Sequence, residues 1–132
     1  GHDLGSTTSS KANGRIALTD ATTITADRYA SGGAGSGLNI ECTAVEFKSS
    51  DIASIQRGTI DLNGVTSNTA TISAVNTSKA FVSYLGMSTS DTSTIGTKIK
   101  NKVALTNSTT VTASAYGTPT TNTISYEVIE FV

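Results

Sequence analysis

The sequence predicts an all-β domain, an antiparallel β-sandwich of the immunoglobulin-like or jelly-roll-like kind with an extended N-terminal arm. Short runs alternate apolar and β-branched residues with polar ones, which is typical of half-buried strands. Polar turns separate these runs at the spacing found in sandwiches and barrels. No segment sustains the apolar period of about 3.6 residues that indicates a helix.

The composition allows a second interpretation, because Ser and Thr make up roughly a third of the 132 residues. Disordered or mucin-like tracts share this bias, but they are rich in proline or charge. Here there is one proline, and charged residues are only 14% of the chain. Thr also suits a strand, since its branched Cβ favours extended backbone while its hydroxyl faces water. We therefore expect a folded chain.

Residues 1–37 are expected to form an N-terminal arm or a small hairpin. The stretch Gly5–Gly14 has almost no apolar side chains, and short β-like runs follow at 16–18 and 22–25. The Gly- and Ser-rich run at 31–37 predicts a linker, because so many glycines lose much entropy on ordering. Residues 38–132 then form the compact sandwich domain.

The compact part contains seven expected strands. Thr43–Lys48 alternates, with Val45 and Phe47 on one face. Ile52–Leu62 is long for one strand, and Gly58 within it predicts a bulge or bend. Thr69–Val75 and Lys79–Leu85 flank a short polar turn and are expected to form a hairpin.

A second hairpin is expected from Lys102–Leu105 and Thr109–Ala115, which flank Asn107 and Ser108. The last strand is Ile124–Val132, whose residues Ile124, Tyr126 and Val128 share one face.

The sequence offers little for catalysis, metal binding or a cofactor, and we expect none of the three. The sole histidine, His2, lies in the N-terminal leader, which makes a His-dependent triad improbable. Cys42 is the only cysteine, and without a His partner we expect a small buried apolar residue rather than a nucleophile. Asp61 begins an Asp-Leu-Asn-Gly run that predicts a turn, since the acidic residues of a calcium loop do not follow.

Charge and hydropathy exclude two further classes of partner. The net charge of −1 lacks the basic surface that nucleic-acid binding requires. No run of about 18 apolar residues is present, so membrane insertion is not expected.

Lys98, Lys100 and Lys102 are the most distinctive charged feature. Strand alternation would place all three on one face. Such lysines either keep an exposed edge strand from aggregating or form a site for an anionic surface or glycan. Sugar-binding surfaces use aromatic rings, and Tyr29, Tyr84 and Tyr116 are the candidates. Lys98, Lys100, Lys102, Tyr84 and Tyr116 are therefore the predicted binding residues.

Four segments in order resemble a small β-sandwich module of tailed-bacteriophage virion proteins. They are the strand with Ile55-Gln56-Arg57-Gly58, the run 73–82, the Leu-Thr-Asn hairpin at 103–113, and the closing strand 125–132. The resemblance covers roughly residues 50–132. It implies a tail, fibre or capsid-surface component without catalytic residues.

The functional expectation is a non-enzymatic structural protein of a phage particle that acts in assembly or surface decoration. Its expected partners are other virion proteins and further copies of itself. The alternative is a receptor- or carbohydrate-binding domain of a tail fibre used in host adsorption, with a host glycan or receptor as ligand. In either case Arg57 is expected to pair with an acid such as Glu127 or Glu130.

Overall fold

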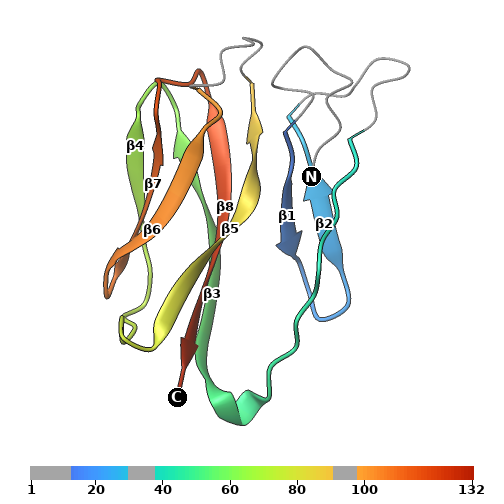
Figure 1. Ribbon diagram of the computed structural model, residues 1–132, viewed down its shortest axis with the longest axis vertical. Coiled ribbons are helices and arrows are strands. Elements are labelled where there is room, and N and C mark those ends of the chain that lie inside the picture. The colour runs from blue at the N-terminus through green and yellow to red at the C-terminus, as the bar shows by residue number, and fades with distance from the viewer. Residues whose placement is uncertain (1–12, 30–37, 91–97) are drawn as a thin grey trace.

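The computed structural model describes residues 13–29, 38–90 and 98–132, and this part of the chain is an antiparallel β-sandwich (Figure 1). His2 and the expected linker at 31–37 lie outside the described residues. The elements in order are β1 (Arg15–Leu18), β2 (Ile24–Asp27), the 3₁₀ helix η1 (Ser49–Asp51), β3 (Ile52–Leu62), β4 (Ser67–Thr71), β5 (Ala80–Thr89), β6 (Asn101–Asn107), β7 (Thr110–Ala115) and β8 (Asn122–Phe131).

Two sheets make the sandwich. The larger has the strand order β2-β1-β5-β8-β3, and the smaller has the order β4-β7-β6. The predicted face of the last strand is confirmed, because Ile124, Tyr126 and Val128 are buried between the sheets. Val111 of the small sheet and Leu62 of the large sheet are fully buried in the same core. Burial of these apolar side chains is the main favourable term for such a fold.

The expected hairpin between 69–75 and 79–85 is wrong. Strand β4 pairs with β7, and β5 pairs with β8, so the chain crosses from one sheet to the other between them. Ile72 and Val75 belong to this crossover, and their side chains are buried in the core between the sheets. Their backbone N–H groups donate to Thr109 and Ser108 in the β6–β7 turn, at 2.9 Å each. The second expected hairpin, β6–β7, is confirmed.

The expected strand Thr43–Lys48 is also wrong, since these residues have no strand partner in the described part of the chain. The segment instead crosses the outer face of the large sheet, and Phe47 meets Phe131 of β8 edge-to-face with ring centroids 5.6 Å apart. Val45, expected on the same face as Phe47, stays 66% exposed, so the alternation of this segment marks neither a strand ladder nor one buried side.

The hairpin β1–β2 joins the large sheet at a single register pair, Arg15 with Gly86. Gly86 has a φ of +96°, and a Cβ there would stand 2.5 Å from the carbonyl oxygen of Gly14. This close approach thus requires glycine. In Figure 1 the hairpin and the segment after it form a third layer beside β5, β8 and β3, opposite the small sheet.

Gly58 does not mark a bulge, because the register of β3 with β8 is continuous there and shifts only between Ile52 and Ser54. Gly58 lies opposite Tyr126, and a Cβ at Gly58 would stand 2.6 Å from the Tyr126 hydroxyl and 2.9 Å from its ring. Tyr126 is only 4% exposed, so its ring cannot move aside without disturbing the core.

We expect Gly58→Ala to lower the free energy of unfolding by about 1–3 kcal/mol, the usual cost of overpacking a core. The measurement is urea denaturation followed by circular dichroism. An exposed strand glycine gains about 0.5–1 kcal/mol when it becomes alanine. A stabilised Gly58→Ala variant would therefore contradict the packing described here.

Candidate functional site

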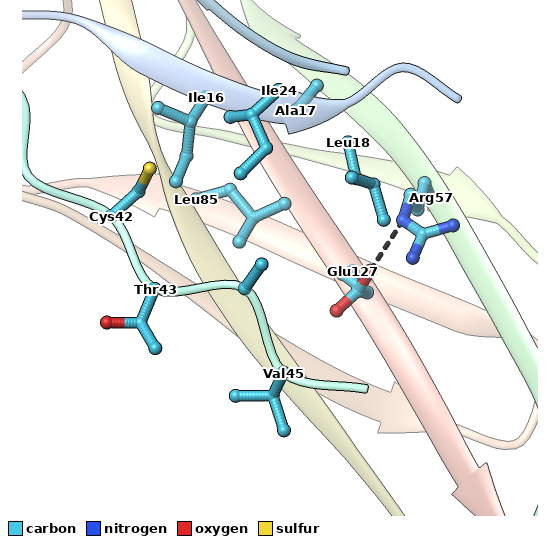
Figure 2. Close-up of a pocket in the computed structure, with 11 residues that line it drawn as sticks. Ile16, Ala17, Leu18, Ile24, Cys42, Thr43, Val45, Arg57, Leu85 and Glu127 are labelled. Carbon is cyan, nitrogen blue, oxygen red and sulfur yellow. Dashed lines mark ion pairs between the residues drawn. The ribbon is translucent and has the colours of Figure 1, made fainter. Parts of the chain in front are cut away.

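A cavity of about 110 Å³ lies between the third layer and the large sheet (Figure 2). Its floor is formed by Arg57 of β3, Leu85 of β5 and Glu127 of β8. Its other walls come from the hairpin β1–β2 and from the segment 42–45. The lining is mostly apolar, and the exceptions are chiefly the charged pair on the floor. The cavity is smaller than a site for a drug-sized ligand.

The charged pair on the floor is Arg57 with Glu127, whose Nε and Oε2 atoms are 2.5 Å apart (Figure 2). The two residues stand opposite each other in the β3–β8 register. The Glu127 side chain is 17% exposed and that of Arg57 is 37% exposed. A carboxylate this well covered needs an opposite charge, and the guanidinium supplies it. The expected ion pair of Arg57 is confirmed, with Glu127 as the partner.

Glu130, the other candidate partner, lies on the opposite face of β8. Its carboxylate accepts hydrogen bonds from the Ser54 hydroxyl at 3.0 Å and from the Asn76 backbone N–H at 2.6 Å. Glu130 thus fastens the crossover between β4 and β5 to the large sheet. Because Glu127 and Glu130 point to opposite faces, they do not form the facing pair of carboxylates that glycoside hydrolysis requires.

Cys42 is exposed, so the expectation that it is a buried apolar residue is wrong. The reason is that it lies on the unpaired segment rather than at the start of a strand. Figure 2 shows the thiol at the rim of the cavity, beside Ile16 of the hairpin.

Lys100, Lys102 and Tyr116 line a second, open depression of about 530 Å³ at one end of the small sheet. The backbone N–H of Tyr116 donates to the carbonyl of Lys100 at 3.3 Å, which holds the two residues together. The Tyr116 side chain is free for contact, since the residue is 82% exposed. Three of the five predicted binding residues therefore come together here.

Lys98 does not join the other lysines by strand alternation. Strand β6 begins only at Asn101, so Lys98 lies in the turn before it. Its carbonyl accepts a 2.7 Å hydrogen bond from the buried side chain of Asn122. The expectation that three lysines share one strand face is therefore wrong.

The other two tyrosines lie elsewhere in the fold. Tyr84 is opposite Tyr126 in the β5–β8 register, and burial raises the pKa of its hydroxyl above the usual 10.0. Tyr29 follows β2 and is 62% exposed. The depression therefore holds one ring of the three, rather than the cluster of two that would favour sugar binding.

An aromatic cluster on the outer face was not anticipated. Phe131 of β8 stacks with Phe81 of β5, with ring centroids 6.0 Å apart, and Phe47 completes the group. Phe81 and Ile55 remain 41% and 40% exposed. The sequence carries part of this signal, because Phe131 lies at an odd position of a strand whose even positions fill the core.

The described residues contain no group of three His, Cys, Asp or Glu side chains able to hold a metal ion. They also contain no helix with the length and apolarity needed to cross a bilayer. Comparison of the chain with protein-family models, with curated proteins and with solved structures finds no match.

The ion pair on the cavity floor can be tested with a double-mutant cycle of Arg57→Met and Glu127→Gln. We expect a coupling free energy of about 0.5–1.5 kcal/mol, because the pair is partly covered yet reaches water. Urea denaturation of the four proteins measures it. The same cycle with Arg15→Met and Asp27→Asn, a pair at 2.7 Å whose carboxylate is 45% exposed against 17% for Glu127, is the control and should give a smaller coupling. A coupling near zero for Arg57 and Glu127 would show that the pair contributes no stability.

Proposed function

We propose that this chain is a non-enzymatic structural module of a tailed-phage virion, acting in assembly or surface decoration through protein–protein contacts. The observation that carries the proposal is the apolar surface of the third layer and the outer face. Its members retain exposures between 36% and 66%: Leu18, Ile24, Val45, Phe47, Ile55 and Phe81. Apolar side chains gathered in this way are typical of a surface that another protein covers.

The resemblance to phage modules supports the same role. Its quoted segments fall on β3, on the crossover leading into β5, on the β6–β7 hairpin and on β8. The first and last are neighbours in the large sheet, joined by the Arg57–Glu127 pair. The residues that carry the resemblance thus belong to one packed unit.

Proteomic analysis of gradient-purified particles tests this proposal. We expect the chain in purified virions at a stoichiometry that fits a repeated structural component. Immunogold labelling then locates it on the head or the tail. Absence of the chain from purified particles of a phage that encodes it would contradict the proposal.

One observation favours a second candidate, a receptor- or glycan-binding domain used in adsorption. The depression with Lys100, Lys102 and Tyr116 combines two cations with an exposed ring, which suits an anionic sugar.

For this second candidate, Tyr116→Ala and the pair Lys100→Ala with Lys102→Ala should each weaken binding to anionic glycans at least about tenfold, as expected when a stacking or charged contact is lost. Surface plasmon resonance on immobilised polysaccharide measures this loss. Lys48→Ala, an exposed lysine away from the depression, is the matched control. Equal binding by all variants, or a location on the head, would contradict the adsorption role.

A further inference from the structure

Strand β3 is the outermost strand of the large sheet and is eleven residues long. One of its edges pairs with β8 and the other pairs with no strand in the described part of the chain. Exposed edges of this length are normally protected by lysine, proline or a covering segment. β3 contains neither lysine nor proline.

The hydrogen-bond pattern identifies which groups point outward from this edge. The backbone N–H of Phe131 donates to Lys79, next to β5, so odd-numbered residues of β8 bond toward β5 and even-numbered ones toward β3. In the β3–β8 register even residues stand opposite even residues. The odd residues Ile55, Arg57, Thr59 and Asp61 therefore direct their N–H and C=O groups to the open edge.

One contact agrees with this direction. The carbonyl oxygen of Asp61 accepts a 2.9 Å hydrogen bond from the side chain of Asn68 on β4. β4 is the edge of the small sheet on the same side, and it contains no lysine, no proline and no charged residue. Neither edge strand on this side carries a lysine or a proline, and the charges on these two strands are Arg57 and Asp61 of β3. The opposite side is different, since Lys102 lies on β6 and the hairpin β1–β2 pairs with β5 at Arg15 and Gly86.

We propose that β3 pairs antiparallel with β3 of a second copy of this chain, with the two-fold axis at Thr59. In this register Thr59 stands opposite Thr59 of the other copy, and Arg57 stands opposite the other copy's Asp61. All these residues have outward backbone groups, so they form hydrogen-bonded pairs. Asp61 keeps a lone pair for the new strand beside its bond to Asn68.

Charge selects this register over its neighbours. Arg57 and Asp61 are four residues apart and are exposed on the same face of β3, so a two-fold axis midway between them creates two opposite-charge pairs at once. An axis at Arg57 would place two guanidinium groups opposite each other. An axis at Gly58 would pair Arg57 with Thr59 and create no opposite-charge pair between the two copies, so Arg57 would keep only Glu127 of its own chain. Parallel pairing in register would align like charges.

The partner is therefore a second copy, because the edge is self-complementary in both hydrogen bonds and charge. Such an interface joins the large sheets of two copies into one continuous sheet, an isologous contact of the kind found in closed dimers. Dimerisation through β3 does not require the virion role. Absence of the chain from purified particles would therefore leave the dimer proposal standing, and a monomeric chain would leave the virion proposal standing.

Sedimentation equilibrium of the full chain tests the interface, and we expect a reversible dimer. Asp61→Lys places a lysine opposite Arg57 of the other copy at both symmetric positions. The variant should therefore raise the dimer dissociation constant at least about tenfold. Glu46→Lys makes the same charge change on the exposed segment before η1 and should leave the constant unchanged. Thr59→Pro removes an N–H that points to the open edge, where proline is tolerated, and should give a folded monomer.

A cysteine trap fixes the register and serves if Thr59→Pro fails to fold. In a Cys42→Ser background, Thr59→Cys should form a disulfide between two copies, because paired residues on neighbouring strands lie at a Cα separation that a disulfide spans. Thr77→Cys, in the exposed crossover, should not. A monomer at every concentration, a dimer unaffected by Asp61→Lys, or equal cross-linking at 59 and 77 would overturn the proposal.

Discussion

Strand β8 lies between β3 and β5 in the large sheet, and both faces of that sheet depend on it. Its even-numbered side chains enter the core, where Ile124 and Val128 are fully buried. Its odd-numbered side chains face the third layer, where Glu127 holds Arg57 and Phe131 holds two further rings. A strand covered on both faces cannot carry an unpaired charge, which explains why its acids have fixed partners. Glu130, on the core side, is fixed by Ser54 and Asn76.

This arrangement separates two kinds of surface. The small sheet is covered on its inner side by an ordinary apolar core. The outer face of the large sheet is covered by the chain's own N-terminal residues, and only in part, so apolar side chains remain accessible there. A module with one closed core and one incompletely covered face is suited to contacts with other proteins.

Much of the sandwich could be predicted from local pattern. Alternation of period two predicts the bounds of β3, the β6–β7 hairpin and the buried face of β8. The ion pair of Arg57 was predicted as well, with Glu127 as one of two candidate partners. Alternation does not say what an apolar residue packs against. The segment 43–48 and the crossover with Ile72 and Val75 alternate as strands do, yet one packs on a sheet face and the other closes the core between the sheets.

The candidate sites were predicted less well, because they depend on contacts distant in sequence. Lys100 and Tyr116 meet only because β6 and β7 form a hairpin, which was foreseeable. The prediction for Lys98 was wrong because β6 begins at Asn101, three residues later than the alternating lysines suggest. The cavity brings β3, β5 and β8 together with a hairpin that ends more than twenty residues before β3, and no local signal indicates that contact.

Amide hydrogen exchange followed by mass spectrometry tests whether β8 is the shared strand and whether the segment 43–48 of the third layer is attached without ladder pairing. Residues 122–131 should exchange only through global unfolding, while residues 43–48 should exchange at nearly the rate of unstructured chain. Protection of 43–48 equal to that of β8 would show that this segment has a strand partner. That result would contradict the three-layer arrangement.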